Sequence, residues 1–302
     1  MELNLIDLDQ QRIGYRQFIS CWLYQSADVT FIVDPGPTSS TNHLISTLRE
    51  SVTHLDYILL THIHLDHAGG TGTICKAFPE AKVVCFEPAV KHMVDPARLW
   101  EGSQKVLREI ADLFGQPEPV PEDKFVPADS VPGLQTILTP GHAKHHQSYI
   151  FDDILFIGEA AGLRLNVNGQ EYLRPATPPR FFPKVAVKSL DKLLAMDLPS
   201  RCAFAHHGMA ENCREILELA RDQHKNWVEH LRIAFTDYKW TAELQEEALQ
   251  LLIEKDPLLS PFNNLDKDLQ VREREFFRNT LEGMLGYLDI RVCQLNCVND
   301  LS

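Results

Sequence analysis

The sequence contains no long apolar run and no charged leader. No stretch of its 302 residues approaches the ~18–20 consecutive apolar residues of a membrane-spanning helix. Residues 1–9 are acidic, whereas a secretory signal peptide begins with basic residues followed by an apolar core. We therefore expect no membrane partner and no secretion.

Paired cysteines are also missing. The seven cysteines are odd in number and scattered, and no two form a C-x-x-C motif, the spacing used by zinc ribbons and thiol redox sites. Because disulfides persist mainly in oxidising compartments, this pattern predicts reduced thiols and a cytoplasmic location.

Basic residues are in the minority. Twenty-nine Lys and Arg stand against 42 Asp and Glu, which gives a formal net charge of −13. Nucleic-acid affinity depends largely on Lys and Arg that neutralise phosphates. The charge therefore disfavours a nucleic-acid partner.

Proline and glycine become rare late in the chain. After position 208 there remain only Pro257, Pro261, Gly283 and Gly286. Because these residue types mark turns, we expect residues 1–209 to form a domain of short elements and residues 210–302 to form a helical cap.

Strand-like and helix-like segments alternate in the first of these domains. The segment at 43–51 has helical spacing, and the other runs are rich in β-branched and aromatic residues. Alternation of this kind predicts a layered α/β domain. The expected strands are 18–24, 29–33, 57–61, 82–86, 134–138, 148–151 and 154–157.

Apolar residues recur with helical spacing in residues 210–302. Thr241 precedes one such stretch and is typical of an N-cap. Gly283 and Gly286 interrupt another stretch at ~1 kcal/mol each in helix propensity, which indicates close packing of both against another backbone. The large apolar residues of that stretch predict a helical layer packed on the first domain, with a helix near the mouth of the site; they are Phe276, Phe277, Leu281, Met284, Leu285 and Leu288.

The densest chemical signal follows the expected strand at 57–61. The segment from His62 to His67 reads H-x-H-x-D-H and holds four metal-binding side chains in six positions. In an extended segment, His62 and His64 point the same way and can bind one ion. Asp66 and His67 turn with the following helix and can reach a second ion. Imidazole and carboxylate ligands suit Zn, Fe or Mn.

With this loop the chain resembles the metallo-β-lactamase superfamily of metallohydrolases. Four further segments match that family's pattern in the same order along the chain. They are Asp34-Pro35-Gly36, Thr139-Pro140-Gly141-His142, Phe156-Ile157-Gly158-Glu159 and Ala205-His206-His207-Gly208. The resemblance implies a four-layer αββα sandwich, here with an all-helical C-terminal extension like that of glyoxalase II-type thioesterases.

The resemblance also implies two divalent metal ions, zinc first with iron or manganese as alternatives. His62, His64 and His142 would bind one ion, and Asp66, His67 and His206 the other, with Glu159 between them. A metal-bridging hydroxide would be the nucleophile, and Asp66 would orient it as the catalytic residue. Asp34 is expected to brace a ligand loop rather than to bind metal.

Two positions depart from the family pattern. Residue 159 is Glu where the family usually has Asp, so it bridges both ions or binds only one. The last histidine is His206 if the small residue before it decides, and His207 if the following glycine decides. The segment 172–179 follows the bridging position. It either forms a pocket wall, with Arg164 or Arg174 facing an anionic group, or is an ordinary surface loop.

The function that the resemblance favours is hydrolysis of a small ester-like substrate, a thioester or a lactone. The alternatives are a phosphodiesterase, an iron-dependent redox enzyme of the same fold, and a non-catalytic metal-binding sensor. The expected partner is a small-molecule substrate, with a homodimer as one option for assembly.

Overall fold

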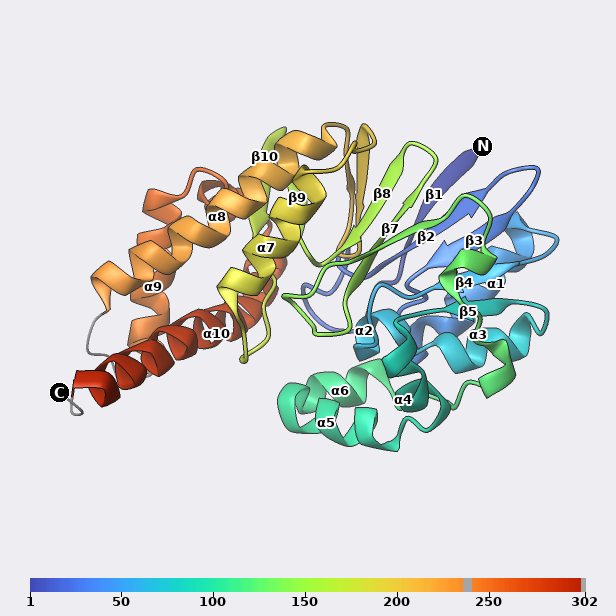
Figure 1. The fold of residues 1–302 in the computed structure, drawn as a ribbon, viewed down its shortest axis with the longest axis horizontal. Helices are drawn as coiled ribbons and strands as arrows, with labels where there is room; N and C mark the ends of the chain where they lie inside the picture. The colour runs from blue at the N-terminus through green and yellow to red at the C-terminus, as the bar shows by residue number, and fades with distance from the viewer. Residues whose placement is uncertain (236–240, 300–302) are drawn as a thin grey trace. The chain divides into compact units, whose positions relative to one another are not determined.

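Two mixed β-sheets frame the part of the chain that carries the histidine-rich loop (Figure 1). The computed structural model describes residues 1–235 and 241–299, and it leaves out the side chains of residue 242 and of residues 289–299. The chain forms two compact units, each built from separate segments. The sheet unit is Met1–Leu138, His145–Gly158 and Pro199–Glu211, and the helical unit is Thr139–Lys144, Glu159–Leu198 and the chain from Asn212 onward.

The first sheet of the sheet unit has the order β1-β2-β3-β4-β5. β1 and β2 pair antiparallel, as do β2 and β3, whereas β3, β4 and β5 run parallel. The carboxyl ends of β3 and β4 therefore meet at one edge. The strands are β1 (Glu2–Asp7), β2 (Ser20–Gln25), β3 (Thr30–Val33), β4 (Tyr57–Leu59) and β5 (Lys82–Val84).

The second sheet has the order β12-β11-β8-β7-β6. β8 and β11 run parallel, and β7 is antiparallel to both β6 and β8. The carboxyl ends of β6, β8 and β11 therefore share an edge. The strands are β6 (Gln135–Leu138), β7 (Gln147–Phe151), β8 (Ile154–Gly158), β11 (Arg201–Phe204) and β12 (Met209–Ala210).

The two sheets pack face to face through aromatic side chains. Phe31 of β3 lies edge-on to Phe151 and Phe156 of the second sheet, with ring centroids 5.1 and 5.8 Å away. Trp22 Nε1 donates to the carbonyl oxygen of Phe204 at 2.8 Å, so β2 is also joined to the end of β11. These contacts fix the two site-bearing edges relative to each other.

Helices of the sheet unit connect the strands, and α1 buries one face through Leu44 and Leu48. The α-helices are α1 (Thr41–Ser51), α2 (Leu65–Ala68), α3 (Thr71–Ala77), α4 (Val90–Val94), α5 (Ala97–Leu107) and α6 (Glu109–Phe114). The 3-10 turns are η1 (Thr38–Ser40), η2 (Glu87–Ala89), η3 (Glu122–Lys124) and η4 (Ala128–Ser130).

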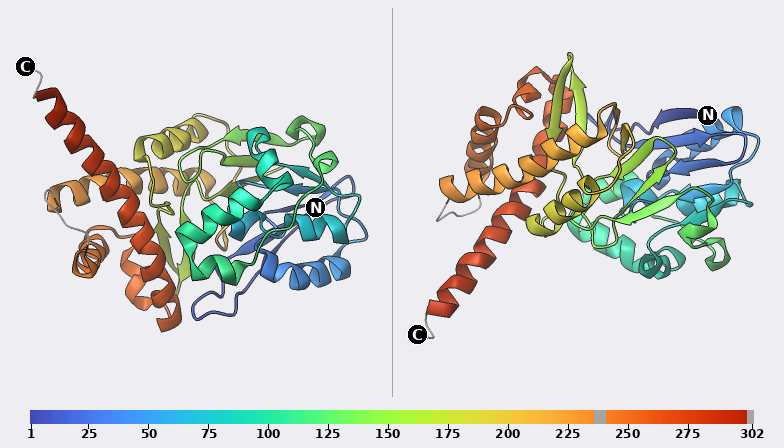
Figure 2. Two further views of the ribbon diagram at one scale, coloured as in Figure 1. Left: turned by 90° about the horizontal axis from the view of Figure 1, so that it is seen from below. Right: turned by 45° about the horizontal axis from the view of Figure 1, so that its top comes forward.

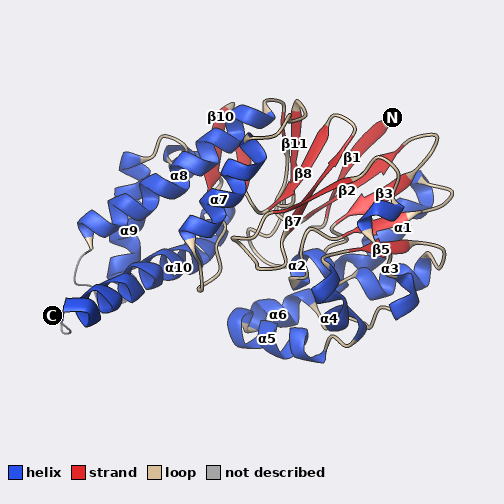
Figure 3. Cartoon of the chain, viewed as in Figure 1, coloured by secondary structure: helices blue, strands red, loops and turns tan. Residues whose placement is uncertain are grey.

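The helical unit contains one hairpin and four long helices. After β12 the described chain is helix and loop only (Figure 3), and α10 runs as one continuous helix in both views of Figure 2. The elements are β9 (Leu163–Val167), β10 (Gln170–Arg174), α7 (Pro183–Leu194), α8 (Cys213–Ala234), α9 (Ala242–Lys255), η5 (Ser260–Asn264) and α10 (Lys267–Asn299).

The helical tail and its N-cap are confirmed. Thr241 Oγ1 accepts from the backbone N–H of Leu244 at 3.1 Å and caps α9. Gly283 is closely packed as expected, because a Cβ there would lie 2.9 Å from Phe181 Cβ. The same expectation for Gly286 is not met by the described residues, since a Cβ at that position would meet none of their atoms within 4 Å. The domain boundary between residues 209 and 210 stays a prediction.

The expected strands form with ends shifted by at most two residues. The strand β1 and the hairpin β9–β10 were not predicted. No disulfide joins the cysteines whose side chains the structure describes, namely Cys21, Cys75, Cys85, Cys202 and Cys213. None of the described helices has the length and apolar composition needed to cross a membrane.

Candidate metal centre

The histidine-rich loop follows β4 and bends where α2 begins. His64 has extended backbone dihedrals and precedes the first residue of α2. The rings of His62 and His64 lie with their centroids 4.6 Å apart, and the ring of His67 lies 4.3 Å from that of His62. The loop therefore gathers its imidazoles in one place, as the alternation of an extended segment predicts.

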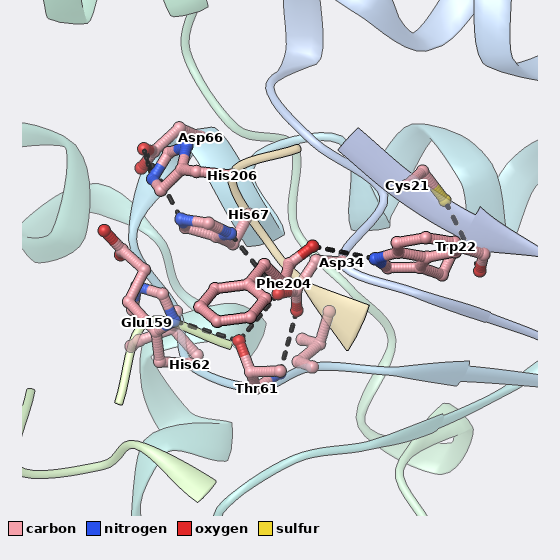
Figure 4. A network of polar contacts seen from close by, with 12 residues as sticks. Cys21, Trp22, Asp34, Thr61, His62, Asp66, His67, Glu159, Phe204 and His206 are labelled. Carbon is pink, nitrogen blue, oxygen red and sulfur yellow. Dashed lines mark hydrogen bonds and ion pairs between the residues drawn. The ribbon is translucent and has the colours of Figure 1, made fainter. Parts of the chain in front are cut away.

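Asp66, His67 and His206 form a compact donor group within the sheet unit (Figure 4). Asp66 Oδ2 lies 3.5 Å from His67 Nε2 and 3.7 Å from His206 Nε2. His206 comes just after β11, and its ring stacks on Phe18 at 4.4 Å. Its Nδ1 donates to the carbonyl oxygen of Phe18 at 3.1 Å, which leaves Nε2 as the atom that faces Asp66.

Asp34 supports two of these histidines from the end of β3. Its Oδ1 accepts from the backbone N–H of Thr61 at 2.8 Å, and its Oδ2 accepts from the Thr61 hydroxyl at 2.6 Å. Oδ2 also lies 3.3 Å from His67 Nδ1. The Thr61 hydroxyl lies 3.0 Å from His62 Nδ1. Asp34 therefore braces the loop, as expected, and orients both rings.

The neighbouring histidines lie differently. His207 has a positive φ of 58°, and its Nδ1 donates to Asp7 Oδ1 at 3.0 Å. The structure thus brings His206, and not His207, to Asp66. His146 is fully buried, and its ring centroid lies 5.2 Å from that of His62. The ring centroid of His145 lies 5.7 Å from that of His64. Both border the donor cluster.

His142 and Glu159 belong to the helical unit and contact each other. His142 Nε2 lies 2.9 Å from Glu159 Oε2, with both side chains almost completely buried. His142 Nδ1 donates to the carbonyl oxygen of Ala176 at 2.8 Å. Glu159 is the residue directly after β8, so both predicted ligands are linked by short stretches of backbone to strand ends of the sheet unit.

The chemistry of these donors fits divalent transition metals. In metal sites a ligating histidine usually donates its second ring N–H to a carbonyl, carboxylate or water, which fixes the ring. His142 and His206 each do so with a backbone carbonyl. Imidazole and carboxylate donors suit Zn, Fe and Mn. The ligand roles of His62, His64, Asp66, His67, His142, Glu159 and His206 stay predictions.

Apart from Asp34, the groups that orient the proposed ligands were missed by sequence reasoning. Thr61 offers only its position at a strand end as a signal. The carbonyl oxygens of Phe18 and Ala176 offer none, because every residue carries one.

Each of the two arginines near Glu159 pairs with a carboxylate. Arg164 binds Glu171, with Nη2 donating to Oε2 at 2.8 Å. Arg174 is buried and forms an ion pair with Glu273 of α10. The expectation of an anion-binding or surface position is therefore wrong for Arg174.

Comparison with known proteins identifies the family. The model of the metallo-β-lactamase superfamily matches residues 14–206. The metallo-β-lactamase fold-containing protein ST1585 of Sulfurisphaera tokodaii is 30% identical over 208 residues, which cover 65% of this chain and 76% of that protein. A hydroxyacylglutathione hydrolase of Vibrio campbellii is 27% identical over 242 residues, 80% of each chain.

Two solved structures share the fold. The crystal structure of ST1585 from Sulfolobus tokodaii has a TM-score of 0.60 at 25% identity and covers 85% of this chain and 97% of its own. That of TTHA1429 from Thermus thermophilus has a TM-score of 0.60 at 21% identity, with 90% and 94% covered. The expected sandwich with a helical C-terminal region is thereby confirmed. The family model extends from the strands before Asp34 to His206, and this stretch carries every predicted ligand. Because the match covers more than half of the chain, the chain belongs to the metallo-β-lactamase superfamily.

Proposed function

We propose that the chain is a dinuclear metal-dependent hydrolase that acts on a small ester-like substrate, a thioester or a lactone. The observation that carries the proposal is the similarity to hydroxyacylglutathione hydrolase, which extends over 80% of both chains. The aligned stretch of 242 residues is longer than the family-model match over residues 14–206. The similarity therefore extends beyond the matched residues. The name of that relative describes hydrolysis of an acyl group attached to glutathione.

The proposed ligands are those with suitable donor chemistry. His62, His64 and His142 hold one ion, and Asp66, His67 and His206 hold the other. Glu159 binds one or both ions, and its contact with His142 supports a place in the same centre. Zinc is the first choice, with iron or manganese as alternatives.

Two bound divalent ions supply hydrolytic chemistry by lowering the pKa of a water molecule and by polarising the substrate carbonyl. Asp66 accepts a hydrogen bond from the attacking water and orients it, with the imidazoles of His67 and His206 beside its carboxylate. Asp34 holds His67 in place through Nδ1. In this scheme no serine, cysteine or other side chain serves as the nucleophile.

The charge of the chain favours a small acyl substrate over a polyanion. A net charge of −13 repels a nucleic-acid backbone. A small thioester or lactone presents a carbonyl without requiring a basic tract to bind it.

The test is a substrate panel assayed with the purified, metal-analysed full chain. The panel contains S-acylglutathiones, acyl-coenzyme A thioesters, lactones, aryl esters and a bis-aryl phosphodiester. We expect two metal ions per chain and turnover of thioesters or lactones. Turnover of the phosphodiester alone would contradict the acyl-hydrolase proposal, and metal binding without any turnover would favour a sensor.

Two variants make the panel specific for the centre. His64→Ala removes a proposed ligand and should lower activity at least about 100-fold, because even residues that only support metal ligands typically contribute 10–100-fold. His54→Ala is the control, since His54 is an exposed histidine whose Nε2 faces Asp56. Equal activity of both variants would exclude His64 from the centre.

A further inference from the structure

The segment 174–181, between β10 and α7 of the helical unit, touches the loops of two proposed ligands. The carbonyl oxygen of Ala176 accepts from His142 Nδ1 at 2.8 Å. Gly162, in the turn after Glu159, packs on the start of the segment, because a Cβ there would lie 2.9 Å from Arg174 C and 3.1 Å from Pro175 Cα. The backbone N–H of Gly162 donates to the carbonyl oxygen of Glu159 at 3.0 Å. Segment 174–181 therefore positions His142 directly and the Glu159 turn by contact.

The same segment is held by one face of α10. Thr280 Oγ1 donates to the carbonyl oxygen of Pro175 at 3.3 Å, and Thr177 Oγ1 donates to that of Thr280 at 3.4 Å. Gly283 lies against Pro178 O so closely that a Cβ would overlap it. Thr280 and Gly283 are three positions apart, which places them on one side of the helix.

A buried ion pair fixes the start of the segment to the same helix. Arg174 pairs with Glu273, and Tyr172 donates to Glu273 Oε2 at 2.8 Å. Arg272 Nε lies 3.0 Å from Glu273 Oε1. Burial acts to raise the pKa of Glu273, but the charges of Arg174 and Arg272 outweigh it and lower the pKa to about 2. Glu273 is therefore ionised at neutral pH.

We propose that this face of α10 orients the imidazole of His142 through segment 174–181, so that Thr280 and Gly283 are positioning residues for the metal ion that His142 binds. The proposal rests on the proposed function only in assigning His142 as a ligand. The physical basis is the short path along the backbone: Pro178, which Gly283 contacts, lies only two positions after Ala176, which holds the ring. A shift of that carbonyl turns the imidazole, and zinc–nitrogen bonds require the nitrogen at ~2.0–2.1 Å.

The chain offers a matched pair of substitutions in α10. Gly283→Ala adds a methyl group that must displace Pro178 or Phe181. Gly286→Ala makes the same chemical change one turn further along, where a Cβ meets no atom of the described part of the chain within 4 Å. Both variants gain the same helix propensity, so the difference between them isolates the contact with segment 174–181.

The readout is metal binding by the full-length apo-protein, titrated with Zn²⁺ and separately with Co²⁺, whose absorption spectrum reports the geometry of its ligands. We expect Gly283→Ala to bind one ion about 10-fold more weakly than wild type and to change the Co²⁺ spectrum, with Gly286→Ala unchanged. Equal affinities and spectra for the two variants would overturn the proposal. Lower stability of Gly283→Ala with unaltered metal binding would also overturn it, because the role would then be structural only.

A second pair of variants applies if Gly283→Ala does not fold. Thr280→Val removes the hydroxyl at nearly constant volume, and Thr280→Ser keeps it. We expect weaker binding of one ion in the valine variant and wild-type binding in the serine variant, and equal binding in both would overturn the proposal. A wild-type chain that binds neither ion would remove the proposed function and this inference together, whereas normal wild-type binding with unaffected variants would remove the inference alone.

Discussion

At the scale of single residues, three imidazoles of the proposed site have Nδ1 beside an oxygen atom. His142 uses the carbonyl of Ala176, His206 uses the carbonyl of Phe18, and His67 lies against the carboxylate of Asp34. In each case Nε2 is the nitrogen that remains for a metal ion or for a neighbouring carboxylate. Such contacts set both the tautomer and the direction of the ring.

The two adjacent histidines after β11 give a direct comparison. We expect His206→Ala to lose one of two metal ions, because Nε2 of His206 faces Asp66. His207→Ala should retain both ions, since its ring donates to Asp7 instead. Metal content after dialysis, measured by inductively coupled plasma spectrometry, separates the two variants. Loss of an ion only in His207→Ala would reverse the assignment.

Asp34 should matter although it is not a proposed ligand. Its Oδ1 accepts from the backbone N–H of Thr61 and its Oδ2 from the Thr61 hydroxyl, and Oδ2 also lies 3.3 Å from His67 Nδ1. An amide group in Asp34→Asn cannot accept with both of its terminal atoms, so one buried donor loses its acceptor. We expect a 10–100-fold loss of metal affinity and a loss of unfolding free energy of about 1–3 kcal/mol. Titration of the apo-protein with Zn²⁺ and urea unfolding measure the two effects. Unaltered affinity would show that Asp34 only stabilises the fold.

The sequence marks the candidate metal-binding residues more clearly than the residues that orient them. Its donors stand in a dense pattern, H-x-H-x-D-H, which few other structures require. Backbone carbonyls such as that of Ala176 carry no sequence signal. Gly283 and Gly286 show the same limit, because helix propensity treats them alike while, among the residues that the structure describes, Gly283 contacts another segment and Gly286 does not. Tertiary contact, which no local pattern encodes, decides between them.

At the scale of elements, helix α8 contains a buried titratable group. His224 is buried, with Nδ1 donating to the carbonyl oxygen of Ala220 at 2.7 Å and its ring beside Phe181. Burial lowers the pKa of His224 from 6.5 to about 4. The folded chain thus keeps this imidazole neutral at pH values where the unfolded chain protonates it.

The pH dependence that follows has a definite sign. Above pH 6.5 His224 is neutral in both states and stability is unaffected, whereas between pH 6.5 and 4 the unfolded state binds the extra proton and stability falls. The loss approaches about 3 kcal/mol across this window at 1.36 kcal/mol per pKa unit. Urea unfolding at pH 7.5 and pH 5 should show a smaller decrease for His224→Leu than for wild type. Equal decreases would mean that the imidazole does not titrate as its burial implies. Glu273, whose pKa is about 2, adds its own loss only below about pH 4.5.

The N-cap of α9 is a second local feature with a measurable effect. Thr241 Oγ1 accepts from the N–H of Leu244, and loss of such a cap costs ~1 kcal/mol. We expect Thr241→Ala to lose about this amount in urea unfolding, and Thr241→Ser to lose little. Unchanged stability in the alanine variant would indicate that this cap does not contribute to global unfolding.

Elements were predictable where apolar and turn residues agree. Strands such as β4 and β8 are short apolar runs ended by polar or glycine residues, and they were identified to within two residues. β1 was missed because, unlike the predicted strands, it has only one β-branched residue and no aromatic residue, and it forms a strand by pairing with β2. The hairpin β9–β10 was missed because its burial comes from the helical unit, where the backbone N–H of Leu173 donates to the carbonyl oxygen of Leu258.

At the scale of the whole molecule, the two units interleave along the chain. The helical unit takes residues 139–144 and 159–198 as well as the chain from Asn212 onward. It therefore includes both His142 and Glu159, which the sequence analysis assigned to the first domain. A compact unit assembled from distant segments is not visible as a boundary in composition.

This interleaving predicts that the C-terminal helices cannot be removed without damage to the rest of the chain. A chain that ends at residue 211 lacks Glu273, so the guanidinium of Arg174, which is buried in the full chain, has lost its partner. Removing one partner of a buried ion pair costs about 3–5 kcal/mol. Segment 174–181 also loses Thr280 and Gly283, its contacts on α10.

We therefore expect the truncated chain to unfold at a lower temperature than the full chain and to bind fewer metal ions. Differential scanning calorimetry and metal analysis of both chains measure this. The full-length variant Glu273→Gln is the matched control, because it removes the charge and keeps every helix. It should reproduce part of the loss of stability, and the truncation should exceed it by the contribution of the missing packing. A truncated chain with the stability, metal content and activity of the full chain would show instead that the helices fold as an independent module and that His142 is held without them.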